Sequence, residues 1–245
     1  MDATSSYHKT RRDLALMLMD VGAVLTFASD NPLVVVRKSP HGKEKGFKLK
    51  LHEKNPNAPL SPLFLNLRTR DNPKPGPLTP RIIDLAARCM RNIELEKHLR
   101  FDAVVGIPRA GEPFAKLLGK FSGKPCIMLD KWEYGDKRRI ASFKGIVPSS
   151  VRKVLVVDDL ITKADSKRET IEVLRGEGIE VTDVIVLVDR EQGGSHELMQ
   201  LGCVLHAVFG ITDMLDIFVR AGKMKPKIRK EIHAYLVREY VESQD

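Results

Sequence analysis

Two adjacent acids, Asp158 and Asp159, directly follow the apolar run 154–157. A run that is apolar on both faces is typical of a central parallel strand, and ligands bind at the carboxyl ends of such strands. Successive strand residues point to opposite faces, so we do not expect the two acids to share one proton. They can instead accept hydrogen bonds from separate hydroxyls of a sugar or help to orient a metal ion.

The residues after the acid pair lead into a predicted helix at about 167–175. The start of a helix offers unpaired backbone N–H groups and a positive dipole end, which suit a phosphate group. A structural alternative is that Ser166 and Glu169 form a capping box and that the acids are solvated at the mouth of a loop. Ser166 can cap the helix and touch a phosphate at once, so the two interpretations overlap.

A second loop, 106–111, also lies between a predicted strand and a predicted helix. Its glycines let the backbone approach an anion, and Arg109 can contact that anion with two hydrogen bonds. The glycine spacing is not that of a dinucleotide-binding fingerprint. A plain tight turn is the alternative.

Alternating strands and helices position these loops. The apolar runs 103–105 and 126–129 flank one predicted helix, and 154–157 and 184–188 flank another, which predicts a parallel sheet with helices on its faces. The amino-terminal part reads as a helix capped at Thr10, antiparallel strands, and a helix that begins at Thr79 and Pro80. We therefore expect an α/β core over 101–245 and a smaller α+β subdomain over 1–100.

Composition excludes several classes of protein. The 245 residues are 42% apolar and 30% charged, with no run long enough to span a bilayer and no signal or transit peptide pattern. Cys89, Cys126 and Cys203 are predicted to be reduced core thiols of a cytoplasmic protein rather than disulfides or metal ligands. The formal charge of +9 indicates an anionic partner, either a polyphosphate or a nucleic acid.

The segment 154–166 resembles the signature of type I phosphoribosyltransferases, which bind 5-phosphoribosyl-1-pyrophosphate (PRPP). The resemblance implies that Asp158 and Asp159 hold the ribose hydroxyls. It assigns the 5-phosphate to the loop residues Thr162, Lys163, Ala164, Asp165 and Ser166. Lys163 stands where a small residue is usual and would add positive charge. Asp165 would be repelled by the phosphate if its side chain faced inward, so either it faces solvent or the affinity is lower.

Other segments between about residues 11 and 218 are similar to orotate phosphoribosyltransferases. The resemblance assigns the pyrophosphate to the loop 106–111, with Arg109 and Ala110. It places Lys50 and Phe64 at the base, Phe64 either stacking on it or packing in the core. Arg190 would bind the orotate carboxylate, and the alternative for this arginine is an ion pair with Asp189 or Glu191.

The stretch 130–145 resembles the mobile loop that closes over pyrophosphate in this family, often from the neighbouring subunit. Lys131 and Lys137 are its catalytic candidates, and Arg138 is a further PRPP-binding candidate. Asp130 occupies the position expected for an arginine, and the stretch contains no histidine.

The resemblance implies transfer of phosphoribose from PRPP to orotate in pyrimidine nucleotide (UMP) biosynthesis. It also implies Mg²⁺ bound mainly through PRPP, a homodimer, and no membrane partner. A phosphoribosyltransferase for another base, or a non-catalytic regulator that binds PRPP or a nucleotide, remains an alternative. RNA binding is not expected, because the aromatic content of 6% includes no stacking signature.

Overall fold

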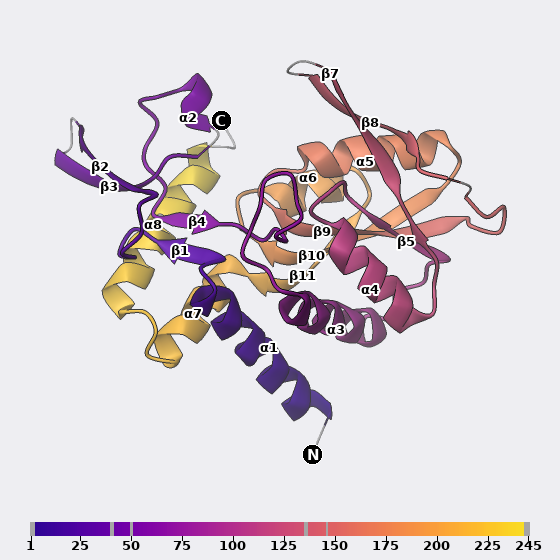
Figure 1. Ribbon diagram of the computed structural model, residues 1–245, viewed down its shortest axis with the longest axis horizontal. Helices are drawn as coiled ribbons and strands as arrows, with labels where there is room; N and C mark the ends of the chain where they lie inside the picture. Colours follow the sequence, from indigo (N-terminus) through magenta and orange to yellow (C-terminus); the bar gives the residue numbers. More distant parts are fainter. Residues whose placement is uncertain (1–2, 40–41, 50, 135–136, 146, 243–245) are drawn as a thin grey trace.

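The computed structural model describes residues 3–39, 42–49, 51–134, 137–145 and 147–242, and at its centre lies a five-stranded sheet (Figure 1). The strand order is β11-β10-β9-β5-β6, and every paired neighbour is parallel. The strands are β5 (Ala103–Gly106), β6 (Cys126–Ile127), β9 (Lys153–Ile161), β10 (Glu180–Asp189) and β11 (Val204–Gly210). The predicted α/β class is confirmed.

Helices cover both faces of this sheet, which explains why β9 is apolar on both sides. Leu155 and Val157 join the core cluster under one set of helices, and Val154 and Val156 join the cluster on the opposite face. The first set is α1 (Ala3–Asp20), α3 (Pro80–Glu96), α4 (Glu112–Ser122) and α7 (Ile211–Arg220). The second is α5 (Asp165–Gly176) and α6 (Gly194–Gln200). Figure 1 shows the two sets on either side of the strands.

Both predicted strand-helix-strand units are present, β5-α4-β6 and β9-α5-β10, and β10-α6-β11 adds a third. The predicted start of α3 is also confirmed. The Thr79 hydroxyl accepts a hydrogen bond from the Ile82 N–H group, and Pro80 is the first helical residue. Proline suits that position because its missing N–H group would have no partner there.

The amino-terminal strands form two small antiparallel sheets. One pairs β1 (Val24–Thr26) with β4 (Leu63–Leu65), and the other pairs β2 (Val34–Ser39) with β3 (Gly42–Phe47). The chain leaves β3 at Phe47, so the expected antiparallel strands are interrupted by a short helix, α2 (Leu51–Lys54). The His52 imidazole accepts a hydrogen bond from the Leu49 N–H group, which turns the backbone there.

The first helix is longer than predicted. It begins at Ala3, so Thr10 is not its cap but an interior residue whose hydroxyl donates to the carbonyl oxygen of Ser6. An interior threonine commonly makes this hydrogen bond to the preceding turn.

Two elements reach beyond the sheet. The hairpin of β7 (Leu129–Tyr134) and β8 (Lys137–Phe143) projects from the core, and α8 (Pro226–Glu242) returns to the amino-terminal strands (Figure 1). The hydrogen bond between the side chains of Tyr235 and Ser61 links α8 to that region. All three cysteines are free thiols, and no described helix is long and apolar enough to cross a membrane.

Candidate functional site

The acid pair lies inside the carboxyl end of β9 rather than in the loop after it. Asp158 and Asp159 are 4% and 8% exposed. Oδ1 of Asp158 accepts a hydrogen bond from the Asp159 N–H group at 2.9 Å, and Oδ1 of Asp159 accepts one from the Leu160 N–H group at 2.8 Å. Backbone donors thus orient both carboxyl groups before any ligand binds.

Lys167 completes this cluster, and it was not among the predicted site residues. Its ammonium group forms an ion pair with Oδ2 of Asp158 and donates to the carbonyl oxygen of Leu160. Lys167 lies on the buried face of α5 with Thr170, Ile171 and Leu174. The sequence pointed to it only through spacing: Lys167 follows the two acids closely and lies at helical spacing from the apolar residues Ile171 and Leu174.

The two carboxyl groups influence each other strongly. The pKa of Asp159 is well above its usual range, first because the side chain is buried, and then because of the Asp158 charge and a hydrogen bond with the Asp158 side chain. Lys167 opposes this rise. The expectation that strand alternation keeps the acids from sharing a proton stays a prediction.

The loop after β9 leads into α5, with Ala164 as the residue before the helix and no side-chain cap. The predicted capping box is wrong, because Ser166 is exposed within the first turn and Glu169 instead accepts from the Ile140 N–H group of β8 at 2.7 Å. Asp165 is exposed, as a phosphate site at this helix start requires. Lys163 is also exposed, and the partly buried Thr162 leads into the loop.

Ala164 is buried, and its N–H group donates to Oε2 of Glu197 in α6 at 2.9 Å. This donor is engaged within the chain. The phosphate assignment of residues 162–166 therefore depends on the remaining N–H groups at the start of α5.

The loop 106–111 lies directly against the acid pair. The Ile107 N–H group donates to the carbonyl oxygen of Val157 at 2.9 Å. A Cβ atom placed on Gly111 would lie 2.3 Å from that same oxygen, so only glycine permits this approach. Ala110 is half-buried and Arg109 is exposed. Burial raises the pKa of nearby Glu112, and the charges of Lys116, Lys144 and Arg109 oppose this rise. The structure thus brings two predicted anion loops together.

Arg190 stands at the end of β10 and is 9% exposed. Its N–H group donates to the carbonyl oxygen of Ile161 at 2.9 Å, which places it beside the loop after the acid pair. In the described part of the chain its side chain has no ion pair, and Nε has no hydrogen-bond partner. Burial lowers the pKa of the guanidinium group, and the charges that oppose this shift belong to Tyr235 and Glu239 of α8.

The alternative ion pair of Arg190 with its neighbours is therefore wrong. The Asp189 carboxylate accepts from the Glu191 N–H group at 2.8 Å, and the Glu191 carboxylate accepts from the Thr212 backbone and hydroxyl. Both acids are thus engaged elsewhere.

The remaining predicted residues are Phe64, Lys50 and three residues of the hairpin β7–β8. Phe64 is half-buried and stacks on Phe47 with 5.6 Å between ring centroids, which supports the packing role. Lys50 lies outside the described residues. Lys131, Lys137 and Arg138 belong to the hairpin β7–β8, where Lys137 pairs with Tyr134 and Arg138 with Glu133, but the side chains of 131–139 are not described.

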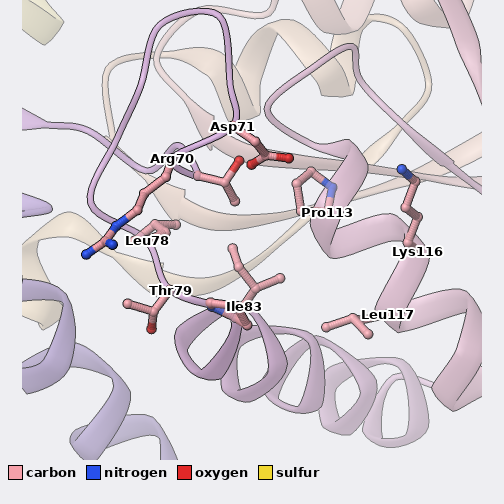
Figure 2. Close-up of a pocket in the computed structure, with 10 residues that line it drawn as sticks. Arg70, Asp71, Leu78, Thr79, Ile83, Pro113, Lys116 and Leu117 are labelled. Carbon is pink, nitrogen blue, oxygen red and sulfur yellow. The ribbon is translucent and has the colours of Figure 1, made fainter.

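A separate pocket of about 570 Å³ flanks the start of α4 (Figure 2). Leu78, Ile83 and Leu117 give it apolar walls, and Arg70 and Lys116 add cationic side chains. None of the predicted site residues lines it. Among the described residues, no group of three or more His, Cys, Asp or Glu side chains is arranged to hold a metal ion.

Comparison with known proteins agrees with this arrangement. The model of the phosphoribosyl transferase domain matches residues 78–205, a range that includes the acid pair, both loops and Arg190. The orotate phosphoribosyltransferase of Saccharolobus solfataricus is 32% identical over 183 residues, which cover 73% of this chain and 86% of that protein.

Two solved structures have a similar fold. The UMP synthase of Leishmania donovani aligns with a TM-score of 0.66 and 26% identity, covering 93% of this chain and 42% of that one. The orotate phosphoribosyltransferase of Aeropyrum pernix aligns with a TM-score of 0.58 and 24% identity, covering 83% and 97%.

Proposed function

Because the chain belongs to the phosphoribosyltransferase family, we propose that it is an orotate phosphoribosyltransferase, which makes orotidine 5-phosphate and pyrophosphate from orotate and PRPP. The choice of base rests on Arg190: its side chain is buried, forms no ion pair with any residue that the structure describes, and has no hydrogen-bond partner there for Nε. A buried charge without a partner is costly. A base that bears a carboxylate removes that cost, whereas uracil or a purine does not.

The reaction breaks the bond between C1 of the ribose and the pyrophosphate oxygen, and the electron pair leaves with pyrophosphate. A ring nitrogen of orotate then forms the new bond to C1, and the proton that this nitrogen carried is released. Positive charge develops on the ribose meanwhile, so the protein contributes mainly by positioning both reactants and by stabilising the separating charges.

Each part of the site has one task in this proposal. Asp158 and Asp159 accept hydrogen bonds from the ribose hydroxyls, which fixes C1 relative to the base. The start of α5 binds the 5-phosphate, since free N–H groups and the helix dipole favour an anion there. Arg109 and the hairpin β7–β8, with Lys131, Lys137 and Arg138, neutralise the departing pyrophosphate.

In this proposal Mg²⁺ arrives bound to PRPP and does not occupy a site made of protein side chains. The described residues contain no cluster of acidic or histidine side chains able to enclose a metal ion, and Lys167 already engages Asp158. Mg²⁺ prefers oxygen ligands and is usually bound through substrate phosphates with few protein ligands. Held by the oxygens of PRPP, it would offset negative charge on the leaving pyrophosphate.

Within this proposal the protein is a cytoplasmic homodimer, and the hairpin β7–β8 of one subunit closes over the site of the other. Free thiols support the compartment, and the projection of the hairpin from the core supports the exchange. The division into a subdomain over 1–100 and a core over 101–245 also belongs to the proposal. Sedimentation at micromolar concentration distinguishes the dimer from the monomer.

The deciding experiment mixes the protein with Mg²⁺, PRPP and orotate and follows the orotate absorbance. Uracil and a purine base serve as controls and should not be consumed. Consumption of another base in place of orotate would contradict the assignment of Arg190. Binding of PRPP in a calorimeter without turnover of any base would identify a regulator instead of an enzyme.

A further inference from the structure

Lys167 is a buried lysine without a task in the reaction described above. It is 4% exposed, and lysine is almost never so enclosed unless it is paired. Ile171 and Leu174, which share its face of α5, are apolar and belong to the core. An apolar side chain would suit position 167 equally well, so packing alone does not account for a lysine.

Stability does not account for it either. Desolvation of two buried charges costs about as much as their attraction returns, and apolar replacements of such pairs are often neutral or stabilising. The ion pair with Asp158 therefore links Lys167 to the function of Asp158. This step rests on the proposed function, in which Asp158 and Asp159 accept from the ribose hydroxyls.

The ammonium group fixes the geometry of the acid at the end of β9. It bridges Oδ2 of Asp158 and the carbonyl oxygen of Leu160, while Oδ1 of Asp158 accepts from the Asp159 N–H group at 2.9 Å. Both carboxylate oxygens thus have a donor in the absence of ligand. Each oxygen keeps a further lone pair for a ligand hydroxyl.

The same group offsets the charge of the pair. Adjacent buried carboxyl groups disfavour each other's ionisation. With Lys167 present, the ionised cluster carries one net negative charge instead of two. Without it, ionisation of both adjacent acids would cost more, and a protonated carboxyl group has fewer acceptor sites for sugar hydroxyls.

We propose that Lys167 is a positioning residue of the ribose subsite, which keeps the side chains of Asp158 and Asp159 oriented as acceptors for PRPP. It acts through the acids and does not itself touch the reacting atoms. Its loss should therefore affect PRPP far more than orotate.

The test compares Lys167→Gln and Lys167→Met with the wild type. Glutamine keeps a hydrogen-bond donor without charge, and methionine removes both. Lys153→Gln is the matched control, because Lys153 pairs with Glu180 at 3.2 Å at the opposite end of the same strand. Thermal unfolding checks that each variant is folded, and calorimetry with PRPP and Mg²⁺ gives the Kd.

Both Lys167 variants should bind PRPP about tenfold or more weakly, the loss expected for a hydrogen bond to a charged group, with an unchanged KM for orotate. Lys153→Gln should bind PRPP as the wild type does. Wild-type PRPP affinity in a folded Lys167→Met protein would overturn the proposal, as would a lower unfolding temperature with unchanged affinity.

If Lys167→Met does not fold, Asp158→Asn combined with Lys167→Met leaves no unpaired charge and is expected to fold. Its PRPP affinity is compared with that of Asp158→Asn alone: equal affinities support the proposal, because Lys167 then acts only through Asp158, and a further loss in the double variant overturns it. Failure of the proposed function looks different, because the wild-type protein itself would then neither bind PRPP nor consume orotate.

Discussion

The backbone N–H group of Arg190 donates a hydrogen bond to the carbonyl oxygen of Ile161 at 2.9 Å. This contact ties the end of β10 to the residue that ends β9, three positions after Asp158. The arginine assigned to the base and the acids assigned to the ribose are therefore held by one pair of parallel strands. Their relative position is a property of the rigid sheet rather than of a loop.

Replacement of Arg190 by methionine should raise the KM for orotate at least about tenfold, because the carboxylate loses its charged partner. The KM for PRPP should change little. Steady-state kinetics with each substrate varied in turn separates the two effects. Arg152→Met, which alters an exposed arginine at the amino-terminal end of β9, is the control. Equal changes in both KM values would argue against a base-specific role.

Replacement of Asp159 by asparagine should abolish most turnover and at the same time stabilise the unliganded protein at neutral pH. Burial, and then the Asp158 charge, raise the folded-state pKa of Asp159, so ionising this carboxyl group costs more in the folded protein than in the unfolded chain. Stability from this group is therefore present at low pH and is lost as the pH rises from the unfolded value, about 3.9, through the folded value.

Unfolding temperatures of the wild type and Asp159→Asn, measured across pH, test this linkage. The stability advantage of the variant should grow as the pH increases, because asparagine stays neutral. An advantage that shrinks with rising pH would contradict the assignment, and unchanged turnover would remove Asp159 from the site.

Replacement of Gly111 by alanine should destabilise the fold by about 1–3 kcal/mol, because the added methyl group would meet backbone atoms that cannot move aside. Its Cβ atom would lie 2.3 Å from the carbonyl oxygen of Val157. Gly176→Ala is the matched control, since no atom lies within 4 Å of a Cβ atom there. Denaturant unfolding measures both, and equal midpoints for the two variants would mean that the loop does not need glycine.

Replacement of Glu169 by alanine should free the base of the β7–β8 hairpin, because the Ile140 N–H group loses its acceptor. Hydrogen exchange at residues 137–143 should become faster, with the unfolding temperature little changed. Glu169→Gln keeps an acceptor oxygen, so its hydrogen exchange should match that of the wild type. Glu172→Ala alters an exposed residue of the same helix and should also match the wild type. Unchanged exchange in Glu169→Ala would show that the hairpin is anchored elsewhere.

Local patterns in the sequence determined the frame of the protein. Apolar runs such as 154–157 predicted the buried strands, and Thr79 with Pro80 predicted the start of α3. Both features depend on a few consecutive residues. The same local patterns located the acid pair and the loop 106–111 at strand ends. The amino-terminal boundaries were less accurate, because the short elements there depend on contacts such as that of His52.

Only the tertiary structure decided how the charges of the site are matched. Lys167 pairs with Asp158, Glu169 supports the hairpin instead of capping α5, and the acids next to Arg190 accept hydrogen bonds from other groups. Helix and strand periodicity predict which side chains are buried, but not which of two acids a buried cation meets. That choice depends on which side chains the packed elements bring within contact distance of each other. The spacing of residues along the chain does not encode such contacts.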